Sequence, residues 1–105
     1  MDRIRFVVKS KLGKEIMVTE RYWSLIVKIK HPIIKDYEKE VKETIEEPEV
    51  IRMSRKDSDV FLHYKRHGKF FVCVLVKHLN GEGFIITAYL ADKIKKGKII
   101  WQREA

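Results

Sequence analysis

The chain has 105 residues, of which 45% are hydrophobic and 36% are charged. This length corresponds to one domain, which we expect over residues 1–105, with a modest hydrophobic core. The 23 Lys and Arg residues exceed the 15 Asp and Glu residues, which gives a formal net charge of +8. Such a balance is typical of nucleic-acid binding, because cationic side chains release counterions condensed on phosphates. A charge that serves only solubility is the alternative.

The sequence also indicates where the protein works. No apolar run approaches the length needed to cross a membrane, and the first residues, M-D-R-I-R-F, lack the apolar stretch of a signal peptide. Cys73 is the single cysteine and lies within a hydrophobic run, so no internal disulfide can form. We therefore expect a cytoplasmic protein without membrane contact.

The first half of the chain predicts a hairpin followed by two helices. Residues 3–9 and 15–18 are β-prone and flank a turn over 11–14. Thr19 is a suitable N-cap for a helix that continues to about residue 30. Pro32 breaks that segment and suits the first turn of a second helix over 32–47, which Pro48 ends.

The second half predicts an antiparallel meander. A strand over 50–53 is followed by strands over 59–66, 69–78 and 83–90, rich in Val, Ile, Phe and Tyr and separated at glycines. A short helical turn is expected over 92–96. The predicted fold class is α+β, with an N-terminal β-hairpin and two helices packed on a four-stranded antiparallel sheet.

A register for the meander assigns its side chains to two faces. With Arg66 opposite Lys69 and His78 opposite Gly83, one face is almost wholly apolar and is expected to carry the helices. That apolar face contains Val60, Leu62, Tyr64, Phe71, Cys73, Leu75, Phe84, Ile86, Ala88 and Leu90. The other face is mixed and carries Phe61, His63, Lys65, Val72, Val74, Val76, Ile85, Thr87 and Tyr89.

The mixed face is the candidate site for chemistry. His63 can exchange protons near neutral pH, Lys65 is cationic, and Thr87 and Tyr89 offer hydroxyls. Such a set suits an RNA phosphodiester, whose cleavage needs proton transfer and cations for the developing charge. A half-exposed strand histidine without a catalytic role is the alternative. The sequence shows neither metal-ligand spacing nor a Gly-rich phosphate loop, so we expect no metal and no cofactor.

Several segments together resemble a known family. These are L-G-K-E-I-M-V-T-E-R-Y-W-S-L-I, K-H-P, E-V-K-E-T-I-E-E-P-E-V-I-R-M-S, Y-K, V-L-V-K and G-F-I-I-T-A-Y-L-A-D-K-I-K-K-G-K-I-I-W. In this order and spacing, over about residues 13–101, they resemble phage-type nuclease domains of the barnase–EndoU–colicin–RelE superfamily. These are small metal-independent ribonucleases and toxins. The resemblance implies a RelE/barnase-like fold with its site on the open face of the sheet.

The resemblance also implies site residues and partners. By position, His31 of K-H-P, Lys65 of Y-K, and Thr87 and Tyr89 of T-A-Y are the catalytic candidates, beside His63. Relatives tend to have a histidine where this chain has Leu25, so RNA binding without cleavage stays open as an alternative. A protein-interaction domain that pairs through a sheet edge is another. The expected partners are RNA and an acidic antitoxin protein. The candidate RNA-binding cations are Arg55, Lys77, Lys93, Lys95, Lys96 and Lys98.

Overall fold

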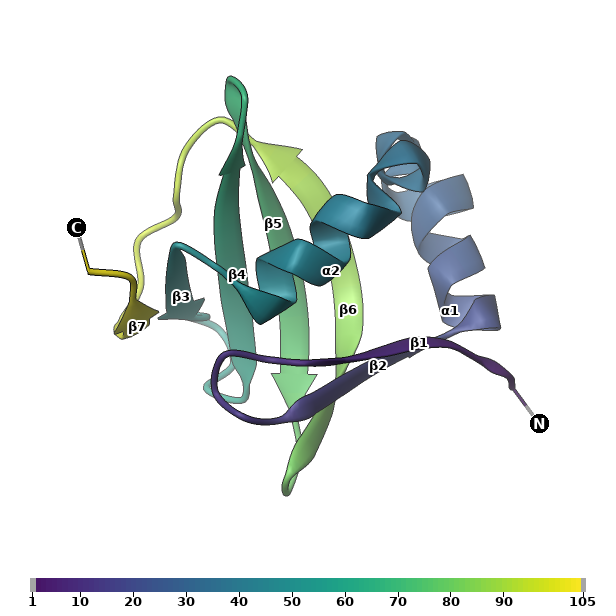
Figure 1. Cartoon of the computed structure of the whole chain (residues 1–105), viewed down its shortest axis with the longest axis horizontal. Helices are drawn as coiled ribbons and strands as arrows, with labels where there is room; N and C mark the ends of the chain where they lie inside the picture. Colours follow the sequence, from purple (N-terminus) through teal and green to yellow (C-terminus); the bar gives the residue numbers. More distant parts are fainter. Residues whose placement is uncertain (1, 105) are drawn as a thin grey trace.

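A computed structural model describes residues 2–104, so residues 1 and 105 of the predicted domain lie outside the described residues. Helices and strands follow one another along the chain in a hairpin–helix–sheet order (Figure 1). The elements are β1 (Ile4–Lys9), β2 (Glu15–Thr19), α1 (Glu20–Leu25), the π-helix η1 (Ile26–Lys30), the 3₁₀ helix η2 (Pro32–Tyr37), α2 (Glu38–Glu46), β3 (Val50–Met53), β4 (Val60–His67), β5 (Phe70–His78), β6 (Glu82–Ala91) and β7 (Ile99–Gln102).

The sheet is larger than the sequence predicts. Its seven strands run in the order β1-β2-β6-β5-β4-β3-β7, and β2 pairs with β6 in parallel. The predicted four-stranded antiparallel sheet is therefore wrong, although the fold is α+β. Strands β3 to β6 form the expected meander, but the hairpin extends one edge and β7 extends the other. These additions rest on pairings between segments far apart in sequence, which local residue patterns do not encode.

The helical half begins as the sequence predicts. The Thr19 hydroxyl accepts a hydrogen bond from the Tyr22 N–H at 3.1 Å, which caps α1. The helix then widens into η1, and His31 leaves helical geometry at φ −147° and ψ 80°. Pro32 disfavours helical dihedrals in the residue before it and starts η2. The chain therefore turns at His31, which leaves this side chain at a corner between two helices.

All the helices pack on one face of the sheet. Trp23, Ile26, Ile34, Val41 and Ile45 from the helices join the hairpin residues and the sheet in the larger core. Its sheet members are Val72, Val74, Val76, Ile85 and Ala88. The helices thus cover the face predicted to be open, and the face that carries Leu62, Cys73 and Leu75 lies on the other side of the sheet. Both faces are apolar enough to be buried, so side-chain polarity alone did not identify the covered one.

The turn between β4 and β5 differs by one residue from the prediction. Gly68 and Lys69 form the two-residue loop, and His67 pairs with Phe70. Gly68 has φ +61°, and every described residue with a positive φ is a glycine. A two-residue turn with its positive φ at the first loop position needs Gly there, and this places Gly68 before Lys69. The pairing of β4 with β5 moves by two residues, which leaves the faces of these two strands unchanged.

A bulge in β6 has a larger effect. Pairing of His78 with Gly83 holds as predicted, but the register shifts between Leu75 and Val76, so that Leu75 pairs with Thr87. One extra residue in β6 reverses the faces beyond it. Ala88 therefore joins Ile85 in the helix-covered core, while Tyr89 joins Ile86 on the opposite side.

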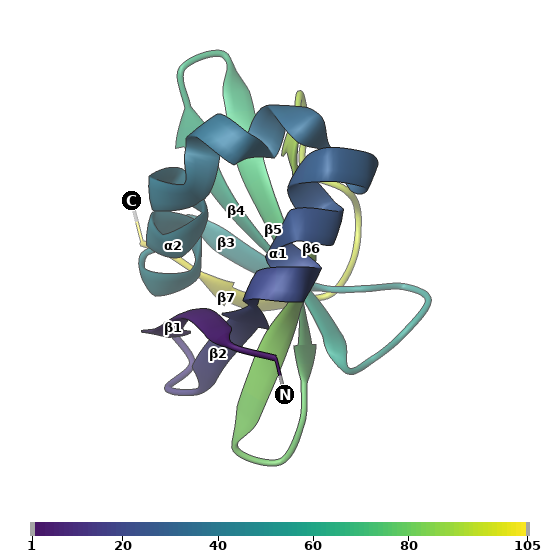
Figure 2. The same cartoon turned by 90° about the vertical axis from the view of Figure 1, so that its right-hand side faces the viewer.

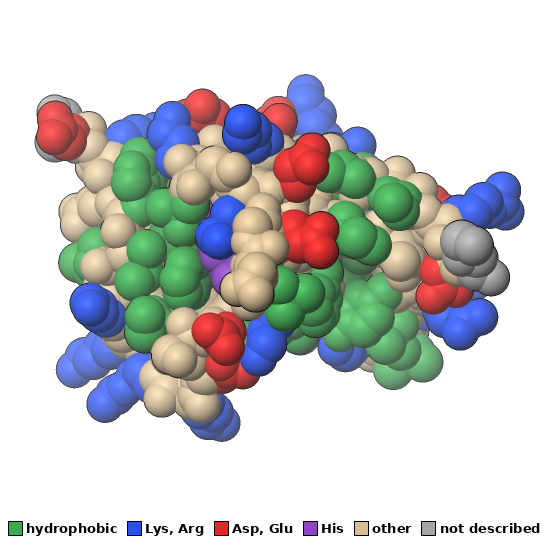
Figure 3. Space-filling model, turned by 90° about the horizontal axis from the view of Figure 1, so that it is seen from below, with side chains coloured by type: hydrophobic (Ala, Val, Ile, Leu, Met, Phe, Trp, Pro, Cys, Tyr) green, Lys and Arg blue, Asp and Glu red, His purple; other side chains and the backbone are tan. Residues whose placement is uncertain are grey.

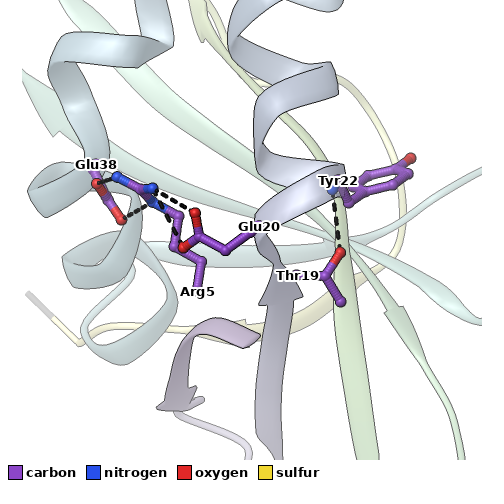
Figure 4. A network of polar contacts seen from close by, with 5 residues as sticks. All are labelled: Arg5, Thr19, Glu20, Tyr22 and Glu38. Atoms are coloured by element: carbon purple, nitrogen blue, oxygen red, sulfur yellow. Dashed lines mark hydrogen bonds and ion pairs between the residues drawn. The ribbon is translucent and has the colours of Figure 1, made fainter. Parts of the chain in front are cut away.

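An arginine fixes both helices to the hairpin. Arg5 in β1 donates to both carboxylate oxygens of Glu38 at the start of α2, each at 2.8 Å, and to Glu20 at the start of α1 (Figure 4). A bidentate pair of this kind fixes orientation as well as distance. These contacts raise the pKa of Arg5 and lower that of Glu38, mainly through their shared hydrogen bonds.

The segment over 92–98, which we call the C-terminal strap, crosses the face opposite the helices. Figure 2 shows α2 on one side of the sheet and the strap on the other. It is not helical, contrary to the predicted helical turn over 92–96. The Lys95 N–H donates to the Tyr64 hydroxyl at 3.2 Å, and the Met53 N–H donates to the Lys98 carbonyl at 2.8 Å. A Cβ at Gly97 would lie 2.6 Å from the Met53 carbonyl oxygen, so glycine permits this close approach.

Neighbouring isoleucines in η2 test the packing. Ile34 is fully buried in the core, whereas Ile33 is 54% exposed. Ile34→Ala should lower the free energy of unfolding by about 2–5 kcal/mol, because it removes buried methylene groups and leaves a cavity. Ile33→Ala is the matched control and should change it by less than about 0.5 kcal/mol. Urea denaturation followed by circular dichroism measures both values, and equal effects would contradict the assignment of the buried face.

Candidate functional site on the uncovered face

The face opposite the helices is crossed by the C-terminal strap, and we call it the uncovered face because the helices pack on the other one. It carries two of the predicted site residues, Thr87 and Tyr89. Thr87 pairs with Leu75 and Tyr89 with Cys73, and Cys73, Leu75 and Tyr89 belong to the smaller apolar cluster on this side. The β6 bulge puts them there, since without it Thr87 and Tyr89 would point toward the helices. Bulges commonly re-aim side chains in this way beside functional sites.

His31 lies beside Tyr89. The centroids of the two rings are 5.3 Å apart, with an angle of 36° between the ring planes. The chain corner at Pro32 holds His31 there, and Lys30 ties that corner to β6 because its ammonium donates to the Ile86 carbonyl at 3.3 Å. The Lys95 ammonium of the C-terminal strap lies 5.7 Å from the centre of the Tyr89 ring. The His31 imidazole and the Lys95 ammonium, from two distant segments, thus both lie beside the Tyr89 ring.

The hydroxyls of this cluster point inward. The oxygens of Thr87 and Tyr89 are buried and have no hydrogen-bond partner within the described residues. Burial raises the pKa of Tyr89, with the Cys73 thiol adding to the shift, and it raises that of Cys73 to about 11. The pKa of Tyr64 rises to about 12 for the same reason. These groups are therefore neutral, and Tyr89 presents its ring rather than its hydroxyl toward His31 and Lys95.

His63 is not part of this site, which corrects the prediction. It pairs with Val74, on the helix-covered face, and is completely buried. Neither ring nitrogen has a hydrogen-bond partner within the described residues. Desolvation lowers the pKa of His63 to about 4, and the nearby His78 adds to the shift. A neutral imidazole sealed from solvent cannot reach a phosphodiester.

Lys65 and Lys77 are also engaged elsewhere. Lys65 points to the helix side, where its ammonium donates to the Glu47 carbonyl at 2.8 Å, just past the end of α2. A cation at a helix C-terminus satisfies a free carbonyl, which is a structural role. Lys77 forms an ion pair with Asp57 at 2.7 Å, and this contact raises the pKa of the lysine and lowers that of the carboxylate. Neither lysine contributes to a site around Tyr89.

Most of the other predicted cations gather around a concavity that we call the cationic groove. It has a volume of about 350 Å³ and lies between β3 and the C-terminal strap. Arg52, Arg55, Lys56, Lys95 and Lys96 line it, with no carboxylate. Within residues 2–104, none of these five makes an ion pair. Figure 3 shows Lys and Arg side chains gathered at the lower left, on the side of the molecule where β7 lies.

The groove has a second, apolar component. Met53, Leu62 and Leu75 also line it, so its floor is hydrocarbon and its rim is charged. Lys98 lines the neighbouring concavity together with Arg55 and Lys56, whereas Lys93 is exposed and lines neither. Arg52 holds the strap, because its guanidinium donates to the Lys95 and Gly97 carbonyls, each at 3.4 Å.

Sequence reasoning missed Lys30, Arg52, Lys56 and the groove floor. Lys30 precedes His31 directly, and Lys56 follows Arg55 in a polar turn, so proximity to residues already chosen was a usable signal. No such signal pointed to Arg52, because its role depends on its contact with Lys95 of the C-terminal strap, 43 residues further along the chain.

Comparison with protein-family models, curated proteins and solved structures finds no match for the chain. The described residues contain no group of three or more His, Cys, Asp or Glu side chains that could hold a metal ion. In the same part of the chain, no helix is long and apolar enough to cross a membrane.

The buried His63 makes stability depend on pH. Its pKa is about 4 in the folded protein, against 6.5 for a solvated histidine, so below pH 6.5 the unfolded state binds a proton that the folded state does not. The free energy of unfolding should therefore fall as the pH decreases from 6.5 to 4, by about 2 kcal/mol between pH 7 and pH 5. Urea denaturation at both pH values measures it.

Two variants separate this effect from other titrations. His63→Leu should remove most of the loss between pH 7 and pH 5, whereas His67→Leu, at an exposed hairpin position, should retain it. An unchanged pH dependence in His63→Leu would show that the buried imidazole is not its source.

Proposed function

We propose that this protein is a metal-independent endoribonuclease that binds RNA on its uncovered face, with His31 as the proton-transfer residue. The observation that carries the proposal is the meeting of His31, Tyr89 and Lys95 on the face that also holds the cationic groove. Five cations without a carboxylate attract a polyanion, and histidine is the side chain best suited to proton transfer near neutral pH. The resemblance to the barnase–EndoU–colicin–RelE superfamily also supports it.

The proposed reaction is attack of a ribose 2′-hydroxyl on the adjacent phosphorus. His31 accepts the 2′-hydroxyl proton, the new P–O bond forms, and the P–O5′ bond breaks. The 5′-oxygen leaves with a proton from Lys95 or water, and the products end in a 2′,3′-cyclic phosphate and a 5′-hydroxyl. Lys95 stabilises the negative charge that develops on the phosphate oxygens, while the Tyr89 ring positions the imidazole. His63, Lys65 and the buried Thr87 hydroxyl have no step in it.

A second candidate is an RNA-binding protein that does not cut. The uncovered face receives one imidazole beside Tyr89, the hydroxyls of Thr87 and Tyr89 are buried, and position 25 carries a leucine. Cleavage usually needs a base and an acid, whereas binding needs only the cations. The choice between the two rests on whether the wild-type protein cuts RNA and whether His31 variants lose that activity.

Two further expectations stay proposals. An acidic antitoxin would compete with RNA if it occupied the cationic groove, since both carry negative charge. A cytoplasmic location is supported by Cys73, which is buried, unpaired and suited to a reducing compartment.

His31→Ala tests cleavage. Loss of a general base typically lowers the rate by about 100- to 10,000-fold, and His31 is partly exposed, so RNA affinity and folding should change little. Cleavage of a fluorescent oligoribonucleotide in EDTA, with analysis of the new ends, measures it. His67→Ala is the matched control and should cut like wild type. If neither protein cuts, the non-cutting candidate remains, whereas equal measurable rates for His31→Ala and wild type would show that His31 is not the proton-transfer residue.

Lys96→Gln tests the groove. The variant removes one phosphate contact, so RNA affinity should fall at low salt and the slope of log K against log salt should decrease by about 0.7. Fluorescence anisotropy over a range of salt concentrations measures both. Lys69→Gln is the control, because Lys69 is an exposed lysine in the β4–β5 turn, away from the groove lining. If both variants weaken binding equally, RNA follows the net charge rather than the groove.

A further inference from the structure

The cationic groove has a charged part and an apolar part, and binding of phosphate accounts only for the charged part. Its rim is cationic, but Leu62 and Leu75 from adjacent strands pair directly opposite each other and form part of its floor. A phosphate group has no favourable interaction with hydrocarbon, whereas the faces of a nucleobase are apolar and its edges are polar. A ligand with a flat apolar group and a neighbouring negative charge matches both the floor and the rim of the groove.

We propose that the cationic groove is a subsite for one unpaired nucleotide of single-stranded RNA, with the base on the Leu62 and Leu75 floor and the flanking phosphates on Lys95, Lys96 and Arg55. This deepens the proposed function and rests on it. The subsite lies beside the cleavage position, since Lys95 lines the groove and also approaches the Tyr89 ring at 5.7 Å. A base held in the groove fixes the register of the chain past His31.

Single-stranded RNA is the form of nucleic acid that the groove favours over a duplex or a free mononucleotide. In a duplex the bases are stacked and paired, so their faces cannot reach a floor set below a charged rim. A free mononucleotide carries the base but contacts the rim with a single phosphate, which releases fewer counterions. The subsite therefore selects an unpaired base within a chain.

Three oligonucleotides of equal length test the subsite. They are a 2′-O-methyl single strand, which binds but cannot be cut, the same backbone with abasic positions throughout, and a 2′-O-methyl duplex. Fluorescence anisotropy with the wild-type protein should show the single strand binding about tenfold more tightly than the abasic strand, the order expected for one well-held base. The duplex should bind no better than the abasic strand at equal phosphate concentration.

Leucine variants locate the effect. Leu75→Gln should reduce the preference for bases to twofold or less and leave the salt slope unchanged, because no phosphate contact is lost. Leu79→Gln, at a 48% exposed loop leucine, is the matched control and should keep the preference. Circular dichroism checks the fold of both variants, and the wild-type comparison with the abasic strand decides the question even if Leu75→Gln does not fold.

The outcomes separate the two levels of the proposal. Equal affinity for the based and abasic strands, or a preference for the duplex, overturns the subsite while RNA binding stands. A base preference that survives in folded Leu75→Gln also overturns it. Failure of all three ligands to bind overturns the proposed function itself.

Discussion

The register shift in β6 is the constraint on which the candidate site depends. It lies opposite Leu75 and Val76, and beyond it Ala88 faces the helices while Thr87 and Tyr89 lie on the uncovered face. A strand without the bulge would bury Tyr89 under the helices and leave His31 without its aromatic neighbour. The local signal is weak, because I-I-T-A-Y is a good strand sequence in either register. The bulge thus creates the site.

Local chemistry explains which parts of the fold could be predicted. The Thr19 cap, the break at Pro32, the hairpin and the strand spans follow from residues close in sequence, and the structure contains each of them. The seven-stranded order does not follow, because the pairing of β2 with β6 joins residues 15–17 to 82–84. Long-range pairing depends on which strand edges remain free after the chain collapses, and the residues within one short segment do not determine this.

The residues chosen from the sequence divide between the two faces of the sheet, for a related reason. His31, Tyr89 and Lys95 were chosen from the sequence and do lie together, whereas His63 and Lys65 lie on the helix side. The error came from assuming that the more polar face stays open. A single imidazole does not prevent burial when it can remain neutral, and the lowered pKa of His63 is the result of that burial.

The positions of the carboxylates determine which cations of this basic chain are left unpaired. Glu20 and Glu38 bind Arg5, Glu47 binds Lys11, and Glu49 lies near Arg103, all within the hairpin, helices and adjoining strand ends. Asp57, at the edge of the groove region, is occupied by Lys77. These acids thus neutralise cations elsewhere, and none of them lines the groove. The unpaired cations of the groove lie on the face where the β6 bulge has placed Tyr89, so charge and geometry select the same surface.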